Sequence, residues 1–414
     1  MLRPLACLLL AALCGLPAHA APSLKIGLNY PRTGNYKDEG LELRRGALLA
    51  VADINRSGGV LGQPLELLSA NTASRAEQAR DNVDRLVAQG ARMVFGGATS
   101  EEAIAAGQRA RELGLLYFAT LSYANDVTGL NGHRYLFRES NSAWMSARVL
   151  GEYLSWHMPR RHYYYISIDD AWGRSMEDAL RRATGSTDRA RHGHSNLPSG
   201  LVRHEQYRQA LEKAAASKAD VLVLVLLGDN LQRSMRMLHN MQLHKQVQVI
   251  VPNLTKSVVQ QAGPVVMEGV IGTLAWTWDL PRQDNNPIGQ DFVERYIAEY
   301  QEYPGSTTAS AYAIVRQWAD AVQRSRSRSL NSEQLIGALE DHSYSLLKDE
   351  QQWRAFDHQN VQSIYAVRVR SRAEVMRDPY KQDYFEVIHR MAGEQAAPSL
   401  DDWQQERGDN LTLQ

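Results

Sequence analysis

The segment "VFGGATSEEAIAAGQRARELGLLYFATLS", residues 94–122, decides the fold. It begins with a buried-strand pattern, turns at two glycines, continues as a helix from Ser100 and ends in a second apolar run. The first amides of a helix have no partner within the helix, and its dipole is positive at that end. With hydroxyls at Thr99 and Ser100, the predicted helix start can serve as a plain N-cap or hold an anion or a ligand oxygen.

The same alternation of apolar runs and helical patterns continues along the chain. Strands are expected in the following runs: 23–31, 63–71, 161–173, 219–230 and 245–255. Between the runs 161–173 and 219–230, the polar, Gly- and Ser-rich segment 183–200 is expected to be a loop. Strands separated by helices predict parallel sheets covered on both faces. The fold class is therefore α/β, with two Rossmann-like lobes.

The last third of the chain is less regular. Residues 269–281 resemble a strand leaving a lobe, and 307–324 form a strong helical pattern. Terminal strands are expected within 352–370 and 383–391. The remaining residues are polar, which predicts a loosely attached C-terminal tail at 391–414.

The N-terminal segment has the pattern of a secretory signal. A basic residue at Arg3 precedes an apolar run, and a small-x-small motif ends at Ala20, so residues 1–20 are expected to be a cleaved signal peptide. Both cysteines of the chain lie inside this segment, and Leu13 before Cys14 does not suit a lipoprotein cleavage site. A mature chain without cysteine favours the bacterial periplasm over a eukaryotic secretory route. Lys plus Arg and Asp plus Glu are 46 each, which gives no reason to expect a nucleic-acid partner.

Several motifs in fixed order carry a family resemblance. The opening "KIGLNYPRTGNYKDEGLELRRGALLAVADINRSGGVLGQPLEL" (25–67) is followed by "VFGGATS", "YLFRES", "DDAWGRS" and "VIVPN". Over about residues 24–370 the chain resembles the type I periplasmic substrate-binding proteins of ABC importers, in the branched-chain amino acid and amide-binding branch. An ordered set of motifs is far more specific than one glycine motif.

The resemblance implies two lobes joined by three chain crossings, which close around a ligand by a hinge motion. Lobe 1 would comprise 24–142 plus 275–342, and lobe 2 would comprise 143–274 plus 343–390. The implied protein is a monomer that is not an enzyme, uses no cofactor or metal, and delivers a small polar ligand (carboxylate, amide or amino-acid-like) to an ABC permease.

The family pattern also implies a ligand site. Ser100 would bind a ligand carboxylate or carbonyl oxygen, and Trp172 would close over the ligand from lobe 2. Three further residues are weaker candidates, because a role in lobe packing or at a hinge competes with ligand binding: Tyr36, Leu227 and Trp276. The segment Leu121-Ser122-Tyr123 would supply backbone groups and a hydroxyl, but Tyr123 stands where relatives often have Thr. Its larger ring would narrow the pocket or stack on a flat ligand.

Asn253 is the departure from the family pattern that says most about the charge of the ligand. Amino-acid-binding relatives often have an acid there as counter-charge to the ligand ammonium, and an unpaired buried ammonium is costly. Either another acid, such as Asp170 or Asp229, supplies the charge, or the ligand lacks an ammonium. We favour the second alternative, in which the ligand is a carboxylate, an amide or another small polar molecule; Tyr123 and Trp172 would also suit an aromatic ligand.

Other functions receive less support from the sequence. A sensory binding protein of the same fold that signals to a membrane receptor kinase is the alternative function, and a secreted hydrolase has the weakest support because no catalytic spacing motif is present. His192 and His194 lie in the predicted polar loop, where a solvated role is favoured over a metal site. His239 and His244 are five residues apart and do not share a helix face well.

Overall fold

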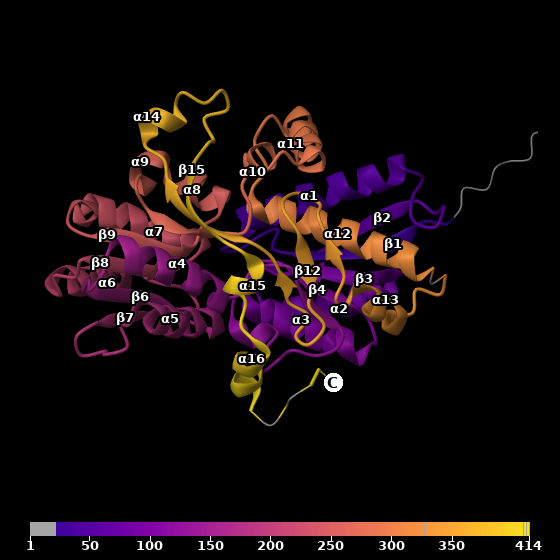
Figure 1. The fold of residues 1–414 in the computed structure, drawn as a ribbon, viewed down its shortest axis with the longest axis horizontal. Helices are drawn as coiled ribbons and strands as arrows, with labels where there is room; N and C mark the ends of the chain where they lie inside the picture. Colours follow the sequence, from indigo (N-terminus) through magenta and orange to yellow (C-terminus); the bar gives the residue numbers. More distant parts are fainter. Residues whose placement is uncertain (1–21, 327, 409, 411, 414) are drawn as a thin grey trace, which may run out of the picture.

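Two α/β lobes lie side by side in the computed structural model, which describes residues 22–414 except 327, 409, 411 and 414 (Figure 1). The expected signal peptide at 1–20 lies outside the described residues. Within the described part of the chain, no helix is both long and apolar enough to cross a bilayer. The fold class predicted from the sequence is confirmed.

The first lobe is built on a five-stranded parallel sheet in the order β2-β1-β3-β4-β5. Its strands are β1 (Leu24–Tyr30), β2 (Leu65–Asn71), β3 (Ala91–Gly96), β4 (Tyr117–Ala119) and β5 (Leu136–Arg138). Helices α1 and α12 pack on each other, and α2 packs on α3. The bounds of the lobe's helices are α1 (Lys37–Arg56), α2 (Ala76–Ala88), α3 (Ser100–Glu112), η1 (Asn125–Val127), α11 (Pro287–Tyr300), α12 (Ser306–Ser325) and α13 (Ser332–Leu339).

The second lobe is built on a seven-stranded sheet in the order β15-β14-β10-β9-β8-β6-β7. Its strands are β6 (Tyr163–Asp169), β7 (His194–Pro198), β8 (Val221–Val225), β9 (Gln248–Asn253), β10 (Ile271–Leu274), β14 (Ile364–Val369) and β15 (Phe385–Met391). β14 and β15 are antiparallel to their neighbours, whereas the others run parallel. The helices are α4 (Ala143–His157), α5 (Ala171–Thr184), α6 (His204–Ala216), α7 (Gly228–Asn240), η2 (Leu243–Lys245), α8 (Lys256–Ala262) and α9 (Pro264–Met267).

The segment 183–200 is only partly a loop, which corrects the expectation from its composition. Residues His194–Pro198 form β7, an edge strand that pairs with β6. Only Leu197 of this strand is fully buried, because an edge strand needs few apolar residues. A polar strand of this kind resembles a loop in its composition.

The chain crosses between the lobes after β5, after β10, and between β13 and β14. A small antiparallel sheet precedes the last crossing; it contains β11 (Ser343–Tyr344), β12 (Gln351–Trp353) and β13 (Asn360–Val361). Trp353 packs its ring edge-on against Phe118 and Phe137 of the first sheet. Residues 351–361, which the sequence assigned to lobe 2, therefore lie against lobe 1.

The crossings are tied together by a buried lysine. Lys348 donates from Nζ to the carbonyl oxygens of Ala275 (2.6 Å) and Ser363 (2.8 Å), one on each of two crossings. Burial lowers the pKa of Lys348 to about 8. Helix α10 (Leu280–Gln283) follows the second crossing, and α14 (Arg372–Val375) lies between the last two strands.

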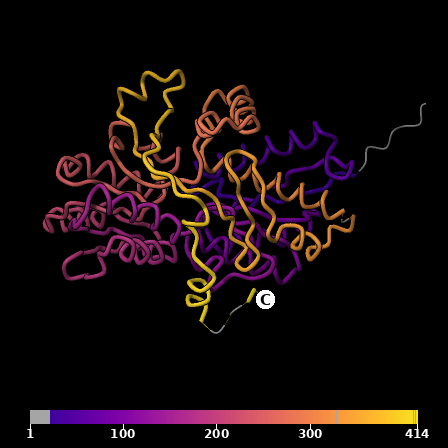
Figure 2. Tube along the Cα trace, in the orientation of Figure 1, coloured from indigo at the N-terminus to yellow at the C-terminus, as the bar shows by residue number. Residues whose placement is uncertain are grey.

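The C-terminal segment is folded rather than loosely attached. After β15 it forms α15 (Gly393–Ala396) and α16 (Leu400–Arg407). Ala396 and Ala397 pack in an apolar cluster with residues of α4, and Trp403 donates from Nε1 to the carbonyl of Thr128 at 2.8 Å. Figure 2 shows this segment, in yellow, descending from the middle of the molecule to its lower edge. It therefore contacts both lobes.

Candidate functional site

A cavity lies where the carboxyl ends of strands from both lobes face each other, which is the usual ligand position in open α/β sheets. Its walls nearly meet in this structure, and the space between them is about 10 Å³. We call it the first cavity; it is lined by Tyr36, Ala98, Thr99, Ser100, Glu101, Leu121, Tyr123, Asp170, Trp172 and Leu227. Six of the residues predicted from the sequence thus come together: Tyr36, Ser100, Leu121, Tyr123, Trp172 and Leu227.

A second cavity, of about 20 Å³, lies next to the first, and Leu121 and Tyr123 line both. Asn253 lines it, together with Glu139 and hydroxyl residues of α12. Asn253 donates from Nδ2 to Ser146 Oγ at 3.3 Å, and its Oδ1 has no partner among the described residues. The tyrosine ring therefore divides the space between the lobes into two parts.

Ser122 and Trp276 line neither cavity. Ser122 is fully buried and donates from Oγ to the carbonyl of Thr99 at 3.2 Å, which ties the β4 loop to the start of α3. Trp276 donates from Nε1 to the carbonyl of Leu347 and packs edge-on against Phe292 at the second crossing. In this structure both side chains support the loops around the site.

Ser100 is the first residue of α3, but it is not the cap. Thr99 caps the helix by accepting from the N–H of Glu102 at 3.1 Å. Ser100 Oγ instead accepts from the N–H of Ala124 at 3.0 Å, so its hydroxyl proton is left to donate elsewhere. The plain N-cap interpretation of Ser100 therefore does not describe this structure.

Two aromatic rings from opposite lobes meet in the first cavity. The centroids of Tyr123 and Trp172 are 6.3 Å apart, and each side chain is only 6% exposed. Nε1 of Trp172 has no hydrogen-bond partner among the described residues. A buried indole N–H normally finds an acceptor, so this donor is available to a ligand.

Hydrogen bonds between the lobes hold this cavity closed. Glu101 accepts at Oε1 from the N–H of Ala171 at 2.8 Å, which joins α3 of lobe 1 to the start of α5 of lobe 2. On the same side, the N–H of Asn125 donates to Ser175 Oγ at 2.9 Å. The structure therefore shows the lobes in contact around the cleft.

A third contact between the lobes is made by a buried carboxylate. Glu39 Oε1, on α1, accepts from Ser257 Oγ at 2.9 Å and Thr255 Oγ1 at 3.2 Å, at the start of α8. Burial raises the pKa of Glu39, and the two hydroxyl donors oppose that rise.

Asp170 lies in the first cavity beside Glu101. It caps α5 by accepting at Oδ1 from the N–H of Gly173 at 2.7 Å. Burial, and next the charge of Glu101, raises the pKa of Asp170 to about 7. Arg174 opposes this shift but pairs with the exposed Asp169 at 2.7 Å. Asp229, the other acid considered as a counter-charge, lines neither cavity.

The sequence did not single out Glu101 or Glu139 as site residues. An acid in the first turn of a helix is a common stabilising feature, so Glu101 carried no distinctive signal. Glu139 follows β5, a three-residue strand that was not predicted. Both lie at the site because of folding contacts between distant segments.

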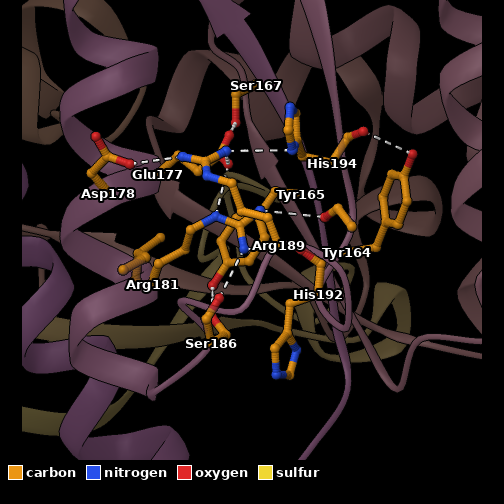
Figure 3. A network of polar contacts seen from close by, with 12 residues as sticks. Tyr164, Tyr165, Ser167, Glu177, Asp178, Arg181, Ser186, Arg189, His192 and His194 are labelled. Carbon is orange, nitrogen blue, oxygen red and sulfur yellow. Dashed lines mark hydrogen bonds and ion pairs between the residues drawn. The ribbon is translucent and has the colours of Figure 1, made fainter.

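The two histidines of segment 183–200 are held by protein contacts (Figure 3). His192 is buried, and its Nδ1 accepts from the N–H of Tyr163 at 3.1 Å. His194 Nδ1 is 3.3 Å from Arg189, and the buried Arg181 donates to the carbonyl of His192. The solvated role expected for His192 is therefore wrong, because its side chain is buried and accepts a backbone hydrogen bond.

His239 and His244 do not share a helix face, since one lies in α7 and the other in η2. Their rings stack with centroids 4.2 Å apart, because the chain turns back directly after α7. Among the described residues, no group of three or more His, Cys, Asp or Glu side chains could hold a metal ion.

Comparisons with known proteins agree with this architecture. The family model "Periplasmic binding protein" matches residues 23–374. An "Amino acid binding protein" of Pseudomonas aeruginosa is 29% identical over 319 residues, which are 76% of this chain and 82% of that protein.

Solved structures share the fold. A periplasmic binding protein from Burkholderia mallei superposes with a TM-score of 0.81 at 21% identity, covering 92% of this chain and 97% of that one. An amino acid ABC transporter substrate-binding protein from Pseudomonas fluorescens gives a TM-score of 0.79 at 23% identity, covering 90% and 96%.

The two sheets and the cavity walled by both lobes define a two-lobed ligand-binding protein. The chain belongs to the periplasmic binding protein family, as its sequence motifs predicted. This is a family of non-enzymatic, substrate-binding proteins of the periplasm.

Proposed function

We propose that this protein captures a small polar ligand in the first cavity and delivers it to an ABC permease in the inner membrane. One observation carries the proposal: the first cavity, beside the carboxyl ends of the strands, is lined by side chains from both lobes. A ligand held there contacts both lobes only in the closed state, so it lowers the free energy of that state. The protein acts as a monomer without catalysis, and residues 1–20 direct it to the periplasm.

The relatives support an amino-acid-like ligand. The Pseudomonas aeruginosa protein is named for binding amino acids, and the Pseudomonas fluorescens protein for amino acid ABC transport. In this chain, Ser100 and Trp172 offer hydrogen-bond donors that suit a carboxylate or carbonyl oxygen.

A thermal-shift screen of the mature protein with L-amino acids, their amides and small carboxylic acids tests the capture of ligand. A ligand that binds only the folded state raises the unfolding midpoint, by an amount that grows with its concentration. If no compound of these classes raises the midpoint, the proposal is wrong.

The site itself is tested by Ser100→Ala and Trp172→Ala. Each is expected to weaken the binding of the stabilising compound about tenfold or more in isothermal titration calorimetry, because each removes a direct donor. Matched controls are Ser155→Ala and Trp156→Ala on the exposed side of α4, where Trp156 is 63% exposed. Unchanged affinity in both site variants would place the ligand elsewhere.

Delivery is tested by uptake of the same compound into cells that lack this chain. Wild-type protein should restore uptake, whereas the variant with both site substitutions should not. Full uptake without the chain would show that it does not serve this transporter.

A further inference from the structure

A larger cavity lies on lobe 1, between the end of α1, the second half of α12 and the segment 342–346. Helices α1 and α12 pack on each other in this lobe (Figure 1). We call this space the third cavity; it shares no lining residue with the first or the second. Its volume is about 350 Å³, which lies within the range of about 300–1,000 Å³ that is typical of small-molecule sites.

The positive charge of Arg316 in this cavity is not matched by an acid. Its guanidinium donates from Nη1 to Tyr312 Oη at 2.8 Å, and it forms no ion pair with any described residue. Tyr312 in turn donates to Asp53, whose carboxylate already pairs with two other arginines. Asp320, the acid in the cavity wall, pairs with Arg324 at 2.6 Å. The unmatched charge of the third cavity is therefore positive.

Neutral hydrogen-bonding groups surround this charge. Gln317 lines the cavity and is only 5% exposed, and its Oε1 has no hydrogen-bond partner among the described residues. A buried amide oxygen without a donor is unusual, so a hydroxyl group placed in the cavity would satisfy it. Ser57, Ser343 and Ser345 line the same cavity. His342 lines it too, and because burial lowers the pKa of this imidazole, it is neutral at pH 7.

We propose that the third cavity is a second binding site, which takes a small anion that carries several hydroxyl groups: a sugar acid or a sugar phosphate. The acid group pairs with Arg316, because a guanidinium presents its N–H donors in a planar fork that matches both carboxylate and phosphate oxygens. One hydroxyl of the ligand donates to Oε1 of Gln317. The site lies apart from the first cavity, so this proposal goes beyond the function proposed above and does not depend on it.

Calorimetry on the mature protein tests the site with four probes: D-gluconate, D-glucose 6-phosphate, uncharged sorbitol, and hexanoate, which has no hydroxyl group. At least one of the two polyhydroxylated anions should bind at least tenfold more tightly than both sorbitol and hexanoate. The anion that binds more tightly identifies the acid group as carboxylate or phosphate. If neither anion binds, or if sorbitol or hexanoate binds as tightly, the proposal is wrong.

Variants of the cavity wall test the two residues directly. Arg316→Gln and Gln317→Leu should each weaken binding of the anion at least tenfold, because one removes the charge and the other removes the acceptor. Gln317→Leu should not lower the unfolding midpoint, since it replaces an unpartnered buried amide with an apolar side chain of similar size. Arg111→Gln, on an exposed arginine of α3 in the same lobe, is the control and should bind as the wild type does.

A variant of the first cavity shows where the anion binds. The double variant Ser100→Ala, Trp172→Ala should keep the affinity for the anion within twofold of the wild type. Loss of binding in this variant would place the anion in the first cavity. Equal losses in Arg316→Gln and Arg111→Gln would indicate unspecific attraction to positive charge. Either result would overturn the proposal.

Discussion

Glu102 illustrates how a single buried acid shapes the wall of the site. It is fully buried in the first turn of α3, where Oε2 accepts from the N–H of Ala98 at 3.2 Å. Its Oε1 has no partner among the described residues. Burial raises the pKa of Glu102 to about 7. The side chain fixes a loop residue that lines the first cavity; burial favours its protonated form, whereas the hydrogen bond from Ala98 favours the carboxylate.

Glu102→Gln should therefore change how stability depends on pH. In the wild type the folded state keeps the proton up to about pH 7, whereas the unfolded chain releases it near its ordinary value of 4.5. The folded state thus binds more protons in this window, and wild-type stability falls as pH rises through it. Glutamine does not titrate, so the variant should gain roughly 2 kcal/mol relative to wild type between pH 5 and pH 8.

Urea unfolding at the two pH values measures this difference. Glu77→Gln, on the exposed face of α2, is the control and should show no such change. Parallel pH profiles for wild type and Glu102→Gln would contradict the assignment of a raised pKa to this residue.

Among the elements, the C-terminal helix is the one whose composition is most misleading. α16 is rich in charged residues, yet Trp403 is 2% exposed and packs near Phe356 with ring centroids 5.4 Å apart. Arg407 is buried too, and it donates to the carbonyl of Gly132 at 3.1 Å. A few well-buried groups thus dock a polar helix onto lobe 1.

Trp403→Ala should lower the free energy of unfolding by roughly 3 kcal/mol, because it removes a large buried ring and leaves the carbonyl of Thr128 without its indole donor. Chemical denaturation measures the loss, and hydrogen exchange should show faster exchange in α16. Trp156→Ala removes an exposed ring and should cost much less. Equal stability of the two variants would mean that α16 does not dock in solution.

The elements that could be predicted are those with strong local signals. Val221–Val225 is a run of five buried apolar residues, and this pattern alone predicts a strand. β5 and β7 were missed because one has three residues and the other is a polar edge strand. The family motifs indicated Ser100 and Trp172. Glu101 and Asp170 are 69 positions apart, so no local pattern could predict that they share a cavity.

At the scale of the whole molecule, closure depends on a close approach between the lobes. Gly228, the first residue of α7, has a φ of +55°. A Cβ added there would lie 2.6 Å from the carbonyl oxygen of Asn35 and 2.9 Å from the ring of Tyr36, both on lobe 1. Only a residue without a side chain allows the lobes to meet in this way.

Gly228→Ala should therefore hold the lobes apart without unfolding either of them. Because the binding-competent closed state becomes less populated, the apparent affinity for ligand should fall about tenfold or more. Small-angle scattering should show a larger radius of gyration with ligand present than for the wild type.

Gly185→Ala is the matched control for this variant. Gly185 has a similar φ of +68°, and an added Cβ would meet nothing within 4 Å. The backbone strain is then comparable without a clash between the lobes. If both variants bind ligand equally well, contact at Gly228 does not limit closure.

The meeting of Tyr123 and Trp172 has an optical consequence. Trp172 is buried and its ring meets Tyr123 of the opposite lobe, so a separation of the lobes should hydrate its indole and shift its fluorescence emission to the red. The other tryptophans in the interior, such as Trp318 and Trp353, lie within or against one lobe and would keep their surroundings. The chain thus carries an intrinsic chromophore at its cleft, through which opening and closing can be followed in real time without any label.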